Sequence, residues 1–458
     1  MLLAAYLWGT RSGSGRRRRL PPGSLSLLPF GYLLSRRFFL QQAARHGPVF
    51  KTTQFGAGAG PNPFFGWIQP VVCVLGWERA LELLRKYDEV LIPPEAPFSR
   101  FIPGRYLRYM EPADHARYRR IFHGAFRDDA IFENEAILAE RIRKGFGAMV
   151  RESQSAGARG IQPEPWIARM HFETFTRIFF GIAPETPCAE RLHRLHYDIR
   201  VENEDEDEVC RALEEIESIL IQQAEALQRQ GDAAPASFLR EIIRLEPTAM
   251  EDVAVRRNLA YILQASWIDA SGLTLWLLKL LCDEPRWLDP VREAIEQGRT
   301  AEADQLADCI VAETLRLFQS EYLYRRTLEE ISVDDFVIPK GWLLRICVTE
   351  NHRDPKVFAD PDTFCPDRFR DRKYSRLEYA PFGATRISCL GEVLTTTLGR
   401  NFVKELAGGF VTALVSDGPL EYRRWHWKPS SRFRIRVEAR DPLVVPASTD
   451  KTEAHPSL

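Results

Sequence analysis

The sequence predicts a mainly α-helical fold with a small β region. Apolar residues recur at spacings of three and four over most of the chain, whereas runs with strand character are few and short. Hydrophobic residues make up 45% of the 458 residues and charged residues 27%, which is typical of a folded protein with a large core. The length alone would allow two or three domains, or one large domain whose core is built around a ligand.

The first clear elements are a strand and two helices. The segment "QPVVCVLGW" (69–77) has the length and the β-branched content of a buried strand. Helical periodicity follows in "WERALELLRKY" and in "NEAILAERIRKGFGAMV", with the proline-rich loop "IPPEAPFSRFIPGR" between them. Further helices are predicted over four segments: 166–181, 209–230, 251–282 and 303–318.

The pattern changes after Phe318. The segment "ISVDDFVIPKGWLLRICV" contains strand-like runs around a Pro-Lys-Gly turn. It is followed by loops, by a helix predicted over 392–415 and by a short strand near 432–438. The β component is therefore expected to stay minor.

Both termini are predicted to lie outside the folded domain. Residues 1–23 would form a flexible basic arm, because the eight apolar residues "MLLAAYLW" precede the basic run Arg16 to Arg19. An apolar segment needs roughly 20 residues to cross a bilayer, so this one cannot span, but the basic run leaves peripheral membrane contact open. Residues 441–458 are predicted as a disordered tail.

Charge and cysteine content narrow the range of partners. The net charge is −1, from 62 basic and 63 acidic residues, so nothing in the overall charge points to a nucleic acid. The eight cysteines are scattered without a CxxC pair, which indicates a reducing compartment. We therefore expect a cytoplasmic monomer that acts on a small molecule.

Three motifs in a fixed order carry the functional signal. Glu313 and Arg316 lie three residues apart in a predicted helix and would share one face, although Glu-x-x-Arg recurs elsewhere in the chain. The segment "FCPDRF" (364–369) follows, and then "PFGATRISCLG" (381–391), in which a Phe, two glycines and an Arg surround Cys389. Order and spacing separate this Glu-x-x-Arg from the other copies.

Together these motifs resemble those of the cytochrome P450 family of heme-thiolate enzymes. The family pattern is a helical Glu-x-x-Arg, then Phe-x-Pro-x-Arg-Phe, then Phe-x-x-Gly-x-Arg-x-Cys-x-Gly. The segment 114–126, "DHARYRRIFHGAF", is similar to the family's third helix. The resemblance runs from about residue 75 to 438 and implies a P450-like fold, a single catalytic domain over 24–440 and one heme b as cofactor.

The resemblance assigns roles to the cysteine loop. Cys389 would be the thiolate ligand of the iron, because a loop that ends in a helix N-terminus offers N–H groups and positive dipole to a negative sulfur. Gly391 would let the backbone pass close under the macrocycle. Phe382 would shield the sulfur from water.

Two further sets of charged residues follow from the resemblance. Cations at the family's offsets would meet the heme propionates: His115, Arg119 and Arg325, with Arg386 of the cysteine loop as a fourth. A buried ion-pair network would hold the cysteine loop in place: Glu313, Arg316 and Arg368.

The cysteine loop departs from the family pattern. Thr385 stands where the family has glycine, Ile387 stands where it has arginine, and Arg386 comes one residue early. Thr385 must therefore adopt the backbone that glycine normally supplies, or the loop takes a shifted path. Arg386 would approach a propionate from a different angle or miss it.

The helix predicted over 251–282 lacks the acidic residue followed by Thr that supplies protons in the family. Counting back from Pro285, those two positions hold Ile268 and Asp269, and a shift of one residue makes Asp269 the acid with Ser271 as the nearest hydroxyl. An ionisable group in an apolar helix costs free energy unless it is paired or functional. Asp269 and Ser271 are therefore the candidate catalytic residues.

The segment after Arg316 also differs, because the family's usual prolines are absent from "RLFQSEYLYRR". Residues of this segment generally line the substrate pocket in the family. Glu321 and Tyr322 would then indicate a substrate with polar or cationic groups.

The resemblance predicts a monooxygenase acting on a small natural-product or lipid-like molecule, with electrons from a ferredoxin or a flavoprotein reductase. The atypical helix leaves three alternatives open: a peroxide-driven oxygenase, an isomerase or dehydratase that needs no reductase, and a heme-binding protein without turnover. Cys389 alone could also be a buried structural thiol or a nucleophile. Neither reading explains the motifs upstream of it.

Overall fold

The structure is a computed structural model, and it describes residues 19–25, 31–55, 68–200, 203, 205–318, 323–383, 385, 387–423 and 426–440. The α-helices are α2 (Gly31–Leu34), α3 (Phe38–His46), α4 (Trp77–Lys86), α5 (Pro112–Ala125), α6 (Asp128–Glu133), α7 (Glu135–Ala156), α8 (Glu164–Phe180), α9 (Pro187–Asp198), α10 (Glu206–Gln230), α11 (Phe238–Leu245), α12 (Val253–Asp283), α13 (Leu288–Glu296), α14 (Thr300–Leu317), α15 (Val348–Asn351), α16 (Asp367–Asp371) and α17 (Glu392–Gly409). Short 3-10 helices are η1 (Pro97–Phe101), η2 (Leu107–Tyr109), η3 (Gly157–Arg159), η4 (Gly231–Ala233), η5 (Ala249–Glu251) and η6 (Pro285–Trp287). The strands are β1 (Val49–Phe55), β2 (Ile68–Val74), β3 (Leu91–Ile92), β4 (Leu323–Thr327), β5 (Ile331–Val333), β6 (Phe336–Ile338), β7 (Leu343–Ile346), β8 (Phe410–Ser416), β9 (Glu421–Arg423), β10 (His426–Lys428) and β11 (Arg434–Ala439).

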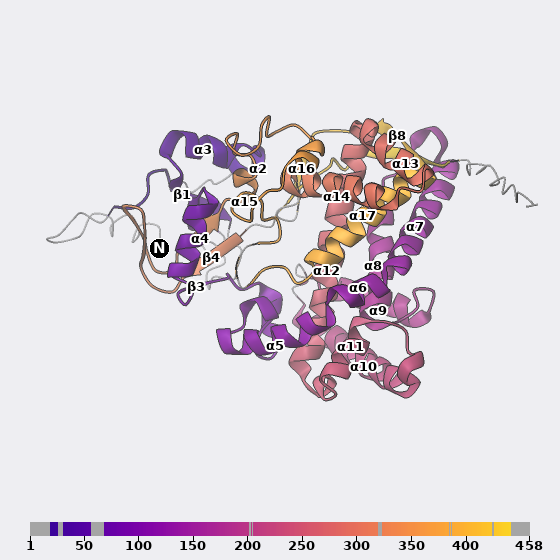
Figure 1. The fold of residues 1–458 in the computed structure, drawn as a ribbon. Coiled ribbons are helices and arrows are strands. Elements are labelled where there is room, and N and C mark those ends of the chain that lie inside the picture. The colour runs from indigo at the N-terminus through magenta and orange to yellow at the C-terminus, as the bar shows by residue number, and fades with distance from the viewer. Residues whose placement is uncertain are drawn as a thin grey trace, which may run out of the picture.

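The molecule has a large helical part and a smaller part built on a sheet (Figure 1). The sheet has the strand order β1-β2-β7-β4-β3. Its β2–β7 pair is parallel, with Cys73 opposite Arg345, and its other pairs are antiparallel. The predicted fold class, mainly α with a small β region, is confirmed.

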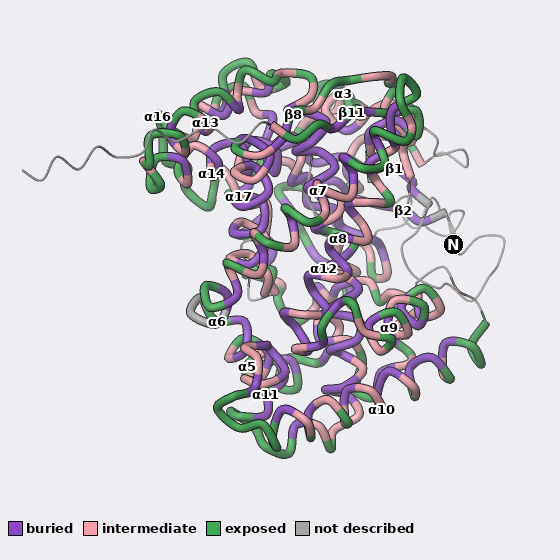
Figure 2. The backbone as a smooth tube through the Cα atoms, turned by 90° about the vertical axis from the view of Figure 1, so that its right-hand side faces the viewer, coloured by how far each residue is buried: buried purple, intermediate pink, exposed green. Residues whose placement is uncertain are grey.

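Helix α12 runs through the centre of the helical part (Figure 2). It packs against α8, α10, α14 and α17, and most of its 31 residues are buried. A helix that is apolar around most of its circumference is stable only inside a core. Its N-terminus is fixed by Asp252, whose carboxylate accepts hydrogen bonds from the Ala254 N–H and from the Tyr118 hydroxyl of α5.

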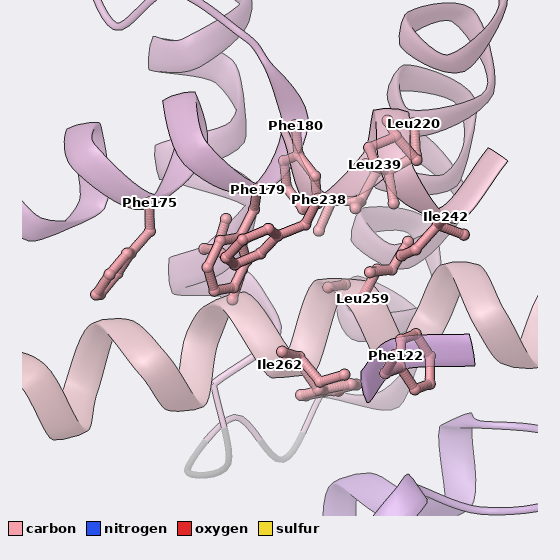
Figure 3. Packing of buried hydrophobic residues seen from close by; sticks show 14 of the residues in the cluster. Phe122, Phe175, Phe179, Phe180, Leu220, Phe238, Leu239, Ile242, Leu259 and Ile262 are labelled. Atoms are coloured by element: carbon pink, nitrogen blue, oxygen red, sulfur yellow. The ribbon is translucent and has the colours of Figure 1, made fainter. Parts of the chain in front are cut away.

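An aromatic cluster joins α8 and α11 beside α12 (Figure 3). The rings of Phe179 and Phe238 lie with centroids 5.0 Å apart, and those of Phe175 and Phe179 lie 5.4 Å apart. Leu259 and Ile262 of α12 belong to the same buried cluster. Because packed aromatic rings bury large apolar areas, this cluster fixes the N-terminal half of α12 against its neighbours.

Most of the predicted helices are confirmed, but the helix predicted over 392–415 is wrong in its last part. Helix α17 ends at Gly409, and the next residues form β8, which pairs with β11. Two consecutive glycines, Gly408 and Gly409, weaken the helix there. Pairing with a distant strand then overrides the local helical periodicity.

Part of the predicted N-terminal arm is held against the folded domain. The Arg19 carbonyl accepts a hydrogen bond from Val337 N–H at 2.9 Å, and the Pro22 carbonyl accepts one from Lys51 N–H at 2.7 Å. A Cβ at Gly23 would lie 2.2 Å from the Lys51 carbonyl oxygen, so only glycine fits there. Residues 1–18 and the predicted tail over 441–458 lie outside the described residues. Among the described helices, none combines the length and the apolar character needed to cross a membrane.

Candidate active site

The cysteine loop closes on itself directly before α17. The Cys389 N–H donates to the Phe382 carbonyl at 3.0 Å, and the Ser388 N–H donates to the Thr385 carbonyl at 3.0 Å. Gly391 is the N-cap residue of α17. These contacts place the Cys389 thiol at the start of a helix.

The glycine that the family pattern would place at Thr385 is not replaced by a strained residue. Three described non-glycine residues have positive φ, and Thr385 is not among them. Gly383 has a φ of 84° instead. Among the described residues of this loop, the left-handed turn therefore lies at Gly383.

Cys389 lines an open hollow of about 620 Å³ and is exposed on that side. Protein surrounds the thiol elsewhere, and this burial raises its pKa to about 11. A hydrogen bond from Gly391 N–H and the charge of Arg108 favour the thiolate, whereas Asp269 and Glu392 oppose it. A thiol with this pKa is a poor free nucleophile at neutral pH, but a coordinated metal ion would deprotonate it.

Of the predicted propionate cations, Arg119 lies against the cysteine loop. Its Nη1 donates to the Ser388 carbonyl at 3.0 Å and its Nη2 to the Ser388 hydroxyl at 3.4 Å. Burial lowers the pKa of Arg119, and the Cys389 thiol acts in the opposite direction. His115 is buried one turn earlier on α5. Arg325 is buried on β4, where its Nη1 donates to the Tyr324 carbonyl.

Glu313, Arg316 and Arg368 meet in one buried network. Arg316 binds Glu313 through two hydrogen bonds of 2.7 and 2.8 Å, and the Arg368 Nε donates to the same carboxylate at 3.1 Å. Glu313 and Arg316 are both 0% exposed. A buried charge pair of this kind is tolerable because its remaining hydrogen-bonding groups are also satisfied. The Cys365 N–H donates to Glu313 as well.

The network reaches the cysteine loop through His352. The Nη1 of Arg316 donates to the His352 carbonyl at 2.8 Å, and the His352 Nε2 accepts a hydrogen bond from Ala380 N–H at 3.0 Å. Burial lowers the pKa of His352 to about 3, so its ring is neutral and its Nε2 can accept. Two hydrogen-bonded steps therefore connect Arg316 to the segment that leads into the cysteine loop.

On α12, two adjacent residues are exposed although most of the helix is buried. Ile268 is 42% exposed although it lies in the middle of this mostly buried helix, and Asp269 is exposed beside it. Partial burial raises the pKa of the Asp269 carboxyl group to about 6, while the charges of Arg108 and Lys428 act against this rise. Asp269 can therefore gain or lose a proton near neutral pH.

Ser271, the other predicted catalytic residue, is bound within its own helix. Its hydroxyl donates to the Trp267 carbonyl at 2.7 Å. Thr274 makes the same kind of bond to Ala270 and also contacts His171 Nε2 at 2.8 Å. These side chains bond to the backbone of α12 close to Asp269.

The sequence did not identify Tyr106 and Arg108, which lie directly before α5. Burial raises the pKa of Tyr106. The charges of Asp269 and of the Cys389 thiolate raise it further, whereas the charge of Arg108 lowers it. Arg108 acts in turn on Asp269 and on Cys389. These charges therefore influence one another. The aromatic and basic segment "YLRY" (106–109) is the one signal in the sequence that points to them.

These residues fit the heme that the resemblance implies. Among the described residues, no group of three or more His, Cys, Asp and Glu side chains could hold a metal ion. A metal at Cys389 would therefore take most of its ligands from a cofactor, as heme iron does. His115, Arg119 and Arg325 would hold the propionates. Three other predicted site residues, Arg386, Glu321 and Tyr322, lie outside the described residues.

Comparisons with known proteins agree with this geometry. The family model "Cytochrome P450" matches residues 195–398. Dimethylnonatriene synthase from Arabidopsis thaliana is 34% identical over 189 residues, which cover 38% of this chain and 36% of that protein. Cytochrome P450 26A1 from Xenopus laevis is 23% identical over 92% of this chain and 91% of its own length. Ent-kaurenoic acid oxidase 1 from Hordeum vulgare is 24% identical over 85% of this chain and 84% of its own length.

A solved structure has the same fold. It is the retinoic acid bound cyanobacterial CYP120A1, with a TM-score of 0.66 and 19% identity, and the match covers 92% of this chain and 100% of that one. The motifs, the fold and these matches lead to one conclusion. They support a member of the cytochrome P450 family, a P450-type monooxygenase with heme b as its cofactor.

Proposed function

We propose that this monooxygenase oxidises a lipid-like or natural-product molecule and takes its electrons from a separate ferredoxin or flavoprotein reductase. The observation that carries the proposal is the loop that closes on itself through the Cys389 N–H and the Phe382 carbonyl directly before α17, which leaves the Cys389 thiol exposed. Heme held by a thiolate supplies the oxygen-activating chemistry. The names of two similar proteins support a hydrophobic substrate, because they contain ent-kaurenoic acid and retinoic acid.

Asp269 is the residue that would move protons in this site. Its pKa of about 6 lets the carboxyl group donate a proton and regain it from water at neutral pH. Ser271 would assist only by giving up its hydrogen bond to the Trp267 carbonyl. We therefore assign the main proton-transfer role to Asp269 and a secondary one to Ser271.

The hollow beside Cys389 is the proposed docking place of the electron donor. It is lined by Arg119, His123, Arg127 and Arg376, with Glu392 as the acidic member. A surface with this excess of cations attracts an acidic protein and speeds its association. Electrons delivered here would enter on the side of the thiol.

A peroxide-driven oxygenase, or an isomerase or dehydratase, is the second candidate. The observation that favours it is Ile268, which occupies the acid position in the unshifted family register and is exposed. An enzyme of that kind would need no electron donor. A heme-binding protein without turnover is the third candidate.

Spectra and turnover separate these candidates. The reduced protein with carbon monoxide should show the red-shifted Soret band of a thiolate ligand, and Cys389→Ala should lose that band. Product formation should require NAD(P)H together with a ferredoxin and its reductase, or a flavoprotein reductase. Turnover with peroxide alone, or with no oxidant, would assign the second candidate, and no turnover under any of these conditions would assign the third.

A further inference from the structure

A cavity of about 40 Å³ lies against one face of the five-stranded sheet, and we call it the sheet cavity. The residues of its lining that matter below are Arg36, Gln54, Tyr324, Arg345, Glu350 and Arg353. Side chains alternate between the two faces of a strand, so Arg325 of β4 points away from the face on which Tyr324 lies. The sheet therefore separates this cavity from the place where Arg325 would meet a heme propionate. A cavity of this size has room for about three water molecules or one compact group.

Two guanidinium groups meet at the sheet cavity. The Nη2 atoms of Arg36 and Arg353 both donate to the Leu317 carbonyl, that of Arg36 at 3.2 Å. Arg353 also donates to the Thr349 carbonyl at 3.2 Å and pairs with Asp362 at 3.4 Å. These contacts use three of the five N–H donors of Arg353 and leave two without an acceptor among the described residues. Like charges that share one acceptor repel each other, and an anion bound beside them would offset this repulsion.

The acidic side chain of the lining is already bound. Glu350 is the one carboxylate among the described residues that line the cavity, and it accepts hydrogen bonds of 3.0 and 3.1 Å from Arg345. Burial lowers the pKa of Arg353 and the charge of Arg316 lowers it further, although Glu350 and Asp362 act in the opposite direction. The surroundings of Arg353 therefore favour a further negative charge.

A buried amide adds a donor from another side. Gln54 of β1 is 3% exposed and lines the cavity. Its Oε1 accepts a hydrogen bond from the Tyr324 hydroxyl at 2.7 Å. Its Nε2 is buried and has no hydrogen-bond partner among the described residues. Leaving a buried donor unpaired costs free energy, so an acceptor bound in the cavity would stabilise this arrangement.

We propose that the sheet cavity binds a phosphate group, supplied by free inorganic phosphate or by the head group of an anionic phospholipid. The donors come from three separate segments, because Arg36 precedes α3, Gln54 lies on β1 and Arg353 follows α15. A ligand held by all three must accept hydrogen bonds from several directions. The tetrahedral oxygens of phosphate can do so, and arginine is well suited to bind them. The site does not take part in the monooxygenase reaction, so the inference goes beyond the proposed function.

Calorimetric titration of the heme-loaded protein with sodium phosphate tests the site, with sodium chloride at equal ionic strength as the reference. Phosphate should bind saturably, and chloride should not. Gln54→Leu removes the amide donor at a similar volume, and Arg36→Gln removes one guanidinium. Each variant should raise the dissociation constant for phosphate by about 10- to 100-fold, because a hydrogen bond to a charged group is lost.

Each variant has a matched control outside the lining of the cavity. Gln69→Leu makes the same change on β2, at the position paired with Gln54. Arg37→Gln removes the same charge from the exposed neighbour of Arg36. Both controls should leave the dissociation constant unchanged. Circular dichroism and heme content of each variant show whether it is folded and loaded.

Vesicles distinguish the two sources of the phosphate group. The protein is sedimented with phosphatidylcholine vesicles that either contain or lack phosphatidic acid. A lipid source predicts sedimentation only with phosphatidic acid, and its loss in Gln54→Leu and Arg36→Gln but not in the two controls. Leu34 of α2 is 80% exposed and lies two residues before Arg36, so it would contact such a bilayer. Binding of free phosphate that depends on Gln54 and Arg36, without this sedimentation, assigns the free anion.

Two results would overturn the proposal. Neither phosphate nor the vesicles with phosphatidic acid bind, or they bind equally well to the two variants and to their controls. Phosphate binding that depends on Gln54 and Arg36, in a protein that shows no NAD(P)H-dependent turnover, would leave this inference standing and reject the proposed function.

Discussion

The two sides of the site are built in opposite ways. On the cysteine side, Glu313 and Arg316 are buried and Arg368 is half-buried. The three are bound to one another and to backbone groups at 2.7–3.2 Å. On the α12 side, Asp269 makes no hydrogen bond or ion pair with a described residue, and its pKa is raised to about 6.

This difference separates support from chemistry. A satisfied charge network holds its neighbours in one arrangement and keeps its ionisation fixed. An acid without a partner, whose pKa lies near neutrality, is suited to exchange protons. The following four predictions test this division.

The largest effect is expected from Arg316→Leu. The variant leaves Glu313 as a buried carboxylate with one fewer cation, which should cost about 3 to 5 kcal/mol of unfolding free energy. Urea denaturation followed by circular dichroism measures this value.

The matched control is Arg244→Leu, from the same Glu-x-x-Arg pattern on a surface helix. Arg244 pairs with Glu241 at 2.8 Å, and its side chain is 58% exposed. An exposed pair contributes about 0 to 1 kcal/mol. If the two variants lost equal stability, the distinction between the buried and the exposed copy would be wrong.

Asn258→Ala is expected to have the next largest effect. It leaves the Leu107 N–H and the Arg105 carbonyl without their side-chain partner, at a cost of about 1 to 3 kcal/mol. The same urea titration measures it. Unchanged stability would show that these two contacts do not hold the loop to α12.

Asp269→Asn should remove a pH dependence of stability. The pKa of Asp269 is raised from 3.8 to about 6 in the folded state. Protonation of Asp269 therefore contributes its full stabilisation of the fold below about pH 4, and this contribution is lost as the pH rises through 6. The carboxyl group is partly exposed, so solvent screening keeps this effect small. The difference in unfolding free energy between wild type and Asp269→Asn should change across pH 4 to 6 and be flat outside that window.

The same variant should alter the ratio of product to released peroxide under turnover. Equal ratios in wild type and Asp269→Asn would remove Asp269 from the proton path. Ser271→Ala should change this ratio less, because the Ser271 hydroxyl is bound to the Trp267 carbonyl.

The smallest effect concerns the electron donor. Arg376 is 70% exposed and lines the hollow beside Cys389. Arg376→Gln should raise the KM for the donor by about two- to fivefold at low salt and have no effect at high salt, where screening removes the attraction. Arg436→Gln, on β11, provides the control with an equal charge change. A similar rise in both variants would place the donor elsewhere.

The sequence predicted the cysteine side better than the α12 side for a physical reason. Glu313, Arg316 and Arg368 lie on segments whose order and spacing are constrained, because a buried network requires each partner. Their meeting could therefore be expected from the motifs. Their assigned roles around heme, like those of His115, Arg119 and Arg325, stay predictions.

Tyr106 and Arg108 could not be predicted in the same way. Their positions depend on the contacts of Asn258, which lies far along the chain and has no motif around it. The end of α17 has a similar cause, because Phe410 leaves the helix to pair with Ala439 of β11. In both cases a tertiary contact between distant segments decides the local structure.

The Asn258 contacts also bear on how this enzyme could be altered. They tie the backbone of Leu107 and Arg105 to the same helix that carries Asp269. This attachment does not involve the segment 96–104, which precedes it in the chain. Directed evolution of the enzyme can therefore vary that segment and keep Asn258 unchanged.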